Sequence, residues 1–86
     1  MKIIKISAIC CGACLITNKV WNELKSNYQF DFVEYDYDMD EEEVMKLSPG
    51  KVLPVFIFYK DNVEVKRLVG EVSYKDLETT FLEVGV

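Results

Sequence analysis

The feature that most constrains this chain is a cysteine pair, Cys11 and Cys14, separated by Gly12 and Ala13. An isoleucine-rich run precedes the pair, and a segment with helical periodicity follows it. A C-x-x-C pair between a strand and a helix is typical of a redox site in an intracellular protein. The first amides of a helix lack intrahelical partners and favour negative charge, so Cys11 gains thiolate character there. The pattern therefore predicts a dithiol–disulfide pair on the first helical turn.

The composition of the chain limits the classes of protein to which it can belong. With 86 residues, half of them apolar, the chain has room for one globular domain, which we expect to span residues 1–86. Its net charge of −5 argues against nucleic-acid and anionic-membrane partners. Three cysteines, two of them adjacent, make a poor framework for a disulfide-stapled secreted domain. The sequence contains no histidine, which excludes His-dependent catalysis and Cys/His zinc sites.

The amino-terminal apolar run is short and is interrupted by Lys5, unlike a secretory signal. No apolar stretch reaches transmembrane length. We therefore expect a cytoplasmic protein that is made without processing.

The first half of the chain reads as strand, helix, strand. Residues 2–8 predict a buried strand, and residues 28–37 predict a second, aromatic-rich strand. Between them, residues 12–27 predict a helix with Trp21 beside its buried stripe, which we assign to Ala13, Ile16, Val20 and Leu24. Strand, helix and strand in this order predict parallel strands and a right-handed crossover.

Residues 38–43 form an acidic run, for which an acidic docking patch or a cation site is one interpretation. We favour the start of a short helix, because carboxylates stabilise the first turn and apolar residues follow. Residues 48–50 would end that helix.

The second half predicts a strand at 52–59 with Pro54 at its start, a tight turn, and a hairpin strand at 63–69. Gly70 breaks that strand. Residues 73–76 match a capping box, which opens a last helix with Leu77, Phe81 and Leu82 facing inward.

This β-α-β-α-β-β-α order, with C-x-x-C at the first strand–helix junction, resembles the thioredoxin superfamily over essentially the whole chain. Its size is similar to that of the minimal thioredoxin and glutaredoxin-like members. The resemblance implies an α/β, thioredoxin-like fold with a four-stranded mixed sheet flanked by three helices. It also implies a cis Leu53–Pro54 bond beside the redox pair, where substrate chains bind, and a glycine, Gly70, after the hairpin. Glutaredoxins usually have a double glycine there, so the second half leans toward thioredoxin.

Three positions depart from the family pattern. Ala13 replaces a proline, Cys10 replaces a tryptophan, and Lys5 replaces a buried acid. The family register places Lys5 near Cys14, where Glu34 or Asp36 could pair with it or where it could extend outward to water. A lysine there would favour the thiolates and make the pair less reducing.

The leading interpretation is a protein disulfide reductase with Cys11 as nucleophile and Cys14 as resolving thiol. It needs no cofactor, and its expected partners are disulfide-bearing proteins and an upstream reductase or low-molecular-weight thiol. We expect a monomer.

Three alternatives stay open at this point. One is glutathione-linked exchange, as in glutaredoxins. Another is a soft-metal module in which Cys10, Cys11 and Cys14 bind copper, zinc or an iron–sulfur cluster, with a fourth ligand from a partner. The third is a redox-inert interaction domain, against which the intact cysteine pair argues. We interpret Cys10 as an incidental thiol, because a bridge between adjacent cysteines is strained.

Overall fold

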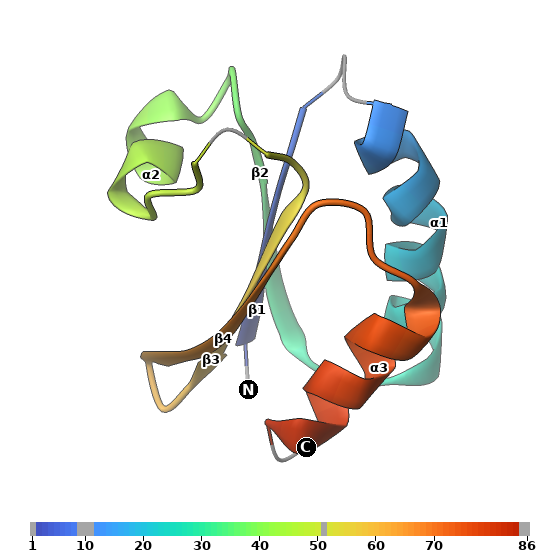
Figure 1. Cartoon of the computed structure of the whole chain (residues 1–86). Coiled ribbons are helices and arrows are strands. Elements are labelled where there is room, and N and C mark those ends of the chain that lie inside the picture. The colour runs from blue at the N-terminus through green and yellow to red at the C-terminus, as the bar shows by residue number, and fades with distance from the viewer. Residues whose placement is uncertain (1, 9–11, 51, 85–86) are drawn as a thin grey trace.

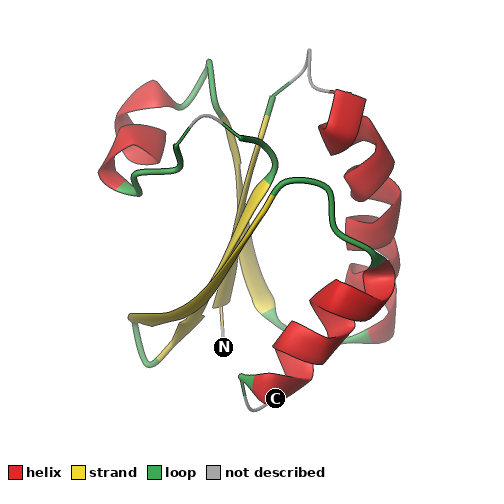
Figure 2. Ribbon diagram, viewed as in Figure 1, coloured by secondary structure: helices red, strands yellow, loops and turns green. Residues whose placement is uncertain are grey.

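The computed structural model describes residues 2–8, 12–50 and 52–84. Strands and helices follow one another in the order that the sequence predicts (Figures 1 and 2). In chain order they are β1 (Lys2–Ser7), α1 (Gly12–Asn27), β2 (Asp31–Asp36), α2 (Glu41–Lys46), β3 (Val55–Lys60), β4 (Val63–Val69) and α3 (Tyr74–Glu83).

The strands form one mixed sheet in the order β2-β1-β3-β4. β1 runs parallel to β2 and antiparallel to β3, and β3 and β4 form an antiparallel hairpin. The parallel pair β1–β2 is joined through α1, as the crossover argument requires. The thioredoxin-like fold class is thereby confirmed.

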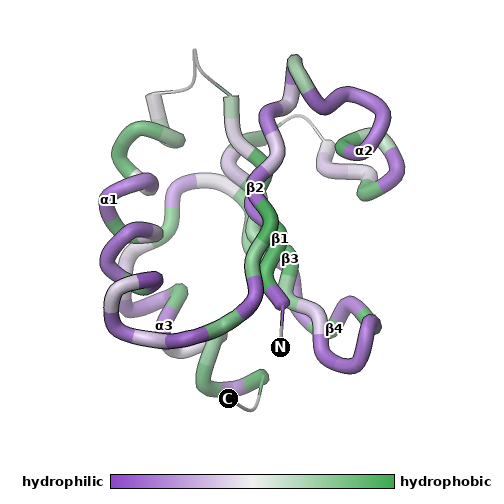
Figure 3. Tube along the Cα trace, turned by 180° about the vertical axis from the view of Figure 1, so that it is seen from behind, coloured by the Kyte–Doolittle hydropathy of each residue, from purple (hydrophilic) through white to green (hydrophobic). Residues whose placement is uncertain are grey.

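Helices cover the two faces of the sheet unequally, with α1 and α3 on one face and α2 on the other (Figure 1). The first face has an aromatic-rich core, and the second has an aliphatic core. The central strands β1 and β3 are accordingly hydrophobic over much of their length (Figure 3). The aromatic core contains Ile3, Trp21, Leu24, Phe56, Phe58, Leu77 and Phe81, and the aliphatic core contains Ile4, Ile6, Val44, Val55 and Ile57.

The second strand is shorter than the predicted segment 28–37. Its first residues do not pair with β1, and their side chains pack against α3 instead. The ring of Tyr28 lies 4.8 Å from that of Phe81, and the Tyr28 hydroxyl donates to Glu78 at 2.8 Å. Phe30 lies 5.1 Å from Phe81. Tyr28 and Phe30 thus pack on α3, and Phe30 also packs on Trp21 of α1 at 5.6 Å, before the strand begins.

The bounds of α1 are those predicted, but its predicted buried stripe is only partly confirmed: Leu24 is buried and Val20 packs against the core, but Ile16 does not. The helix buries Cys14, Thr17, Trp21 and Leu24, whereas Ile16 is exposed. Thr17 can be buried because its hydroxyl donates to the Ala13 carbonyl at 2.7 Å, within the helix itself. Apolar character alone therefore does not identify the whole buried face of α1.

The other local signals are largely confirmed. The acidic run supplies the first turn of α2, although the Asp40 side chain accepts from the Asp36 amide instead of capping the helix. Asp61 and Asn62 both have positive φ in the β3–β4 turn. Ser73 and Asp76 form the predicted capping box of α3. Leu82 is exposed, contrary to prediction, and Thr80 is buried in its stead.

Candidate active site

The elements that flank the cysteine motif meet at one end of the sheet. The carboxyl end of β1, the start of α1, the start of β3 and the end of β4 all lie there (Figure 1). Cys10 and Cys11 lie outside the described residues. Gly12, Ala13 and Cys14 form the first turn of α1, and Cys14 is only 1% exposed. Cys14 therefore sits at the positive end of the helix dipole but is shielded from water.

The Leu53–Pro54 peptide bond is cis, as the family resemblance implied. Pro54 is buried and immediately precedes β3. The Gly70 amide donates to the Pro54 carbonyl at 2.8 Å, so the two predicted positions are in direct contact. Gly70 has a φ of +86°, and a Cβ there would lie 3.4 Å from the Val52 side chain. A glycine is needed at this position, since other residues rarely adopt that φ.

Lys5 lies in the sheet with its side chain buried against α1, and the side chain is only 6% exposed. Its ammonium donates to the Asn18 side-chain oxygen and lies 3.7 Å from a Glu34 carboxylate oxygen. Of the two partners that the sequence suggested, the structure selects Glu34. The carboxylate of Asp36 instead accepts from the backbone amides of Asp38 and Met39, at 2.9 and 3.0 Å. Lys5 does not extend outward to water.

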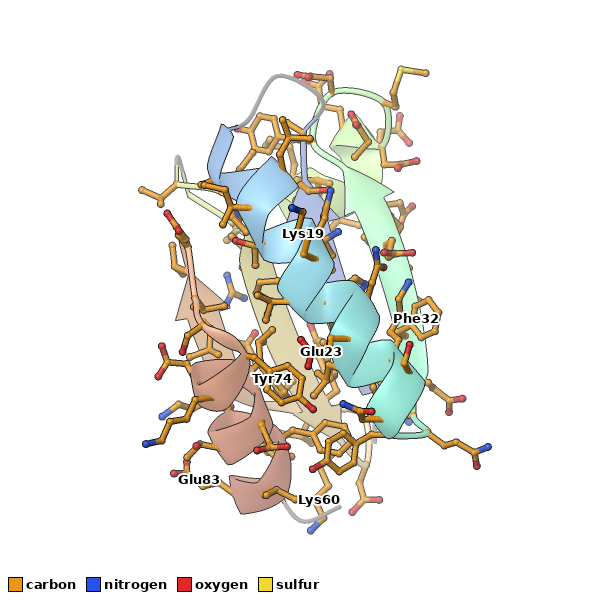
Figure 4. All side chains as sticks on the ribbon, turned by 90° about the vertical axis from the view of Figure 1, so that its right-hand side faces the viewer. Lys19, Glu23, Phe32, Lys60, Tyr74 and Glu83 are labelled. Carbon is orange, nitrogen blue, oxygen red and sulfur yellow. The ribbon has the colours of Figure 1, made fainter. Side chains whose placement is uncertain are left out.

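Glu34 is the centre of a small polar network under α1. Besides facing Lys5, its carboxylate accepts from the Trp21 indole N–H at 2.7 Å and lies 3.7 Å from the Lys25 ammonium. The Lys25 ammonium also lies 4.8 Å from the centroid of the Phe32 ring, which stands beside α1 in Figure 4. In the same view Lys19 and Glu23 lie on the outer side of the helix.

The pKa of Lys5 lies below its usual value of 10.5, chiefly because burial penalises the charged form. Glu34 acts in the opposite direction and raises this pKa, and Lys25 lowers it further. Cys14 also raises it, by electrostatic attraction. The Lys5 ammonium therefore interacts with the buried cysteine as well as with its acidic partner on β2.

The sequence analysis missed the roles of Asn18, Trp21 and Lys25. With Cys14 they are spaced by four, three and four residues, and so share one face of α1. That spacing, read together with an acid on the neighbouring strand, was the available signal. Asn18 and Lys25 are polar, so an apolar stripe at helical spacing does not include them.

Within the described parts of the chain, no three acidic or cysteine side chains are grouped to hold a metal ion. Two of the three cysteines of the metal hypothesis fall outside those parts. Among the helices of residues 12–27, 41–46 and 74–83, none has the length and apolar character of a membrane span.

The strand order, the cis proline and the buried cysteine on the first turn of α1 define a thioredoxin-like protein. Residues 1–83 match the thioredoxin family model, and the chain belongs to the thioredoxin family. The superfamily resemblance seen in the sequence is thus confirmed.

Individual relatives agree with this assignment. The chain is 35% identical to thioredoxin H5 of Oryza sativa subsp. japonica over 84 residues, which cover 96% of this chain and 61% of the relative. It is 31% identical to thioredoxin Asp f 29 of Aspergillus fumigatus over 70 residues, covering 79% and 64%. The chain therefore spans less than two thirds of the length of these curated relatives.

Solved structures show the same architecture. Reduced thioredoxin pre-protein of Schistosoma mansoni superposes with a TM-score of 0.86 at 28% identity, over 95% of this chain and 76% of the other. A malarial protein superposes with a TM-score of 0.89 at 25% identity, over 99% and 97%.

Proposed function

We propose that this protein is a thiol–disulfide oxidoreductase that reduces protein disulfides through Cys11 and Cys14. The observation that carries the proposal is the position of Cys14. It is buried on the first turn of α1, at the end of the sheet where Pro54 and Gly70 meet, in a chain of the thioredoxin family.

The burial of Cys14 divides the roles between the two cysteines. A cysteine that is 1% exposed has its sulfur out of reach of a disulfide in a folded substrate protein. The Cys14 sulfur can still react with a neighbouring sulfur of its own motif. Cys14 therefore suits the resolving role, and Cys11, one residue before the helix begins, takes the role of nucleophile.

The exchange then runs in two balanced steps. The Cys11 thiolate attacks the substrate disulfide, a mixed disulfide forms, and the first substrate sulfur leaves as a thiolate that takes a proton from water. The Cys14 thiolate attacks the Cys11 sulfur, the Cys11–Cys14 bond forms as the Cys11–substrate bond breaks, and the second substrate sulfur leaves as a thiolate that takes a proton from water. The protein dithiol is oxidised by two electrons and the substrate disulfide is reduced to two thiols.

Substrates in this proposal are disulfide-bearing proteins, and the dithiol is regenerated by an upstream reductase or a low-molecular-weight thiol. The chain is proposed to act as a cytoplasmic monomer. The proposed exchange needs no cofactor, because the two cysteines of the motif carry the electrons.

Trapping tests the proposal. Cys14→Ser should attack a disulfide substrate and then stop at the mixed disulfide, visible as a mass adduct that reductant removes. Fragmentation should map the adduct to Cys11, and the Cys10→Ser/Cys14→Ser variant should form the same adduct. An adduct on Cys10, or no adduct, would contradict the assignment of the nucleophile.

A further inference from the structure

Lys5 is the one charged residue in the core of the described part of the chain. Burying an ammonium group is unfavourable unless other charges and hydrogen bonds compensate for it. Ile3, which lies on the same face of β1, is apolar and fully buried, so this face of the strand accepts an apolar side chain. The position therefore calls for an explanation beyond packing.

Two potential anions, Glu34 and Cys14, act electrostatically on the Lys5 ammonium, and they differ in their access to water. The Glu34 side chain is 43% exposed, and its carboxylate also faces Lys25 and accepts a hydrogen bond from the Trp21 N–H. Cys14 is almost completely buried, one helical turn before Asn18, the hydrogen-bond partner of Lys5. Charges attract more strongly where water is excluded. A thiolate on Cys14 would thus depend on Lys5 far more than Glu34 does.

We propose that Lys5 is a positioning residue of the redox site, whose buried ammonium stabilises the thiolate of Cys14, while Glu34 weakens this effect by holding the same ammonium toward β2. The inference rests on the proposed function, since the Cys14 thiolate is the species that resolves the mixed disulfide. Asn18 fixes the direction of the Lys5 side chain beneath the first turns of α1.

The proposal fixes the sign of the effect on the redox equilibrium. The Cys14 thiolate exists only in the dithiol form, because its sulfur is neutral once the Cys11–Cys14 bond has formed. Stabilising that thiolate favours the reduced protein and raises the reduction potential. Lys5 and Glu34 should therefore shift the potential in opposite directions.

Equilibration with glutathione buffers tests this prediction. Lys5→Met, which keeps the length of the side chain without its charge, should shift the equilibrium toward the disulfide by about tenfold, or about 30 mV in potential. Glu34→Gln, which can still accept from Trp21, should shift it toward the dithiol. Lys25→Met is the matched control: its ammonium also faces Glu34 but is 26% exposed, and it should change the equilibrium less than Lys5→Met does.

A second readout does not require any redox turnover. In a Cys10→Ser/Cys11→Ser background, Cys14 is the remaining thiol of the chain. Its ionisation, followed by thiolate absorbance, should move to higher pH when Lys5→Met is added and to lower pH with Glu34→Gln. If Lys5 has a purely structural role, Lys5→Met should lower the stability of the fold and leave both the redox equilibrium and the ionisation of Cys14 unchanged.

The outcomes are separable from those of the proposed function. A wild-type protein that forms the Cys11–Cys14 disulfide, together with an unchanged potential and an unchanged ionisation in Lys5→Met, would overturn the role of Lys5 alone. A wild-type protein that forms no such disulfide would overturn the proposed function, and the ionisation of Cys14 would still decide the role of Lys5. If circular dichroism shows that Lys5→Met does not fold, the direction in which Glu34→Gln shifts the redox equilibrium decides the role of Lys5.

Discussion

The two faces of the sheet differ in both packing and chemistry. The α1–α3 face is filled by aromatic rings, with Trp21 within 6 Å of three phenylalanine rings at 5.4, 5.6 and 5.9 Å between centroids. The α2 face has an aliphatic core, and Val44 is the buried residue of its six-residue helix. The face that carries the cysteine helix is thus the more heavily packed one. A buried charge such as Lys5 requires surroundings of that kind, because only a fixed network can hold its partners in place.

Truncating the central residue of each core to alanine should give the largest losses of unfolding free energy. The two losses show which face of the sheet contributes more to stability. Trp21→Ala should lower the free energy of unfolding by about 3–5 kcal/mol, because it leaves a large cavity among aromatic rings. Val44→Ala removes two methyl groups and should lower it by about 2 kcal/mol. Urea denaturation monitored by circular dichroism measures both.

Trp21→Phe is the control that separates packing from polarity. It keeps a ring in the cavity but removes the N–H that binds Glu34. It should cost less than Trp21→Ala, since Glu34 is partly exposed and can bind water instead. Equal losses for Trp21→Ala and Val44→Ala would show that the two faces contribute alike, against the comparison drawn above.

A smaller effect is expected in the pH dependence of stability. Because the pKa of Lys5 is lowered on folding, the unfolded chain binds more protons than the folded one between that lowered value and 10.5. The contribution of Lys5 to stability therefore rises as the pH rises through this alkaline interval. In a Cys14→Ser background, which removes the thiol coupled to Lys5, the difference in unfolding free energy between proteins with Lys5 and with Lys5→Met should change accordingly, and titrating groups distant from Lys5 cancel. A difference that is constant with pH would show that Lys5 keeps its ordinary pKa.

The sequence was sufficient for the element order and for several local devices. The bounds of α1 and β4, the tight turn between β3 and β4 and the capping box all follow from signals within a few residues, and the structure has them. Leu53–Pro54 required the family resemblance, since proline alone says little about the isomer of its peptide bond.

Long-range packing accounts for what could not be predicted. Thr17 and Thr80 look polar in the sequence but are buried, whereas Ile16 and Leu82 look apolar but are exposed. Which face of a helix is covered depends on where the sheet and the other helices lie. The Glu34 network is a similar case, because Lys5 and Trp21 are brought to one carboxylate only by the β1–β2 register and the crossing of α1.

Reduction of insulin disulfides, with a dithiol reductant recycling the protein, tests the central claim most directly. Wild type and Cys10→Ser should both catalyse the reduction, and Cys11→Ser should lose catalysis because the attacking thiolate is gone. Catalysis that survives in Cys11→Ser, or that is lost in Cys10→Ser, would contradict the assignment of Cys11 as the nucleophile.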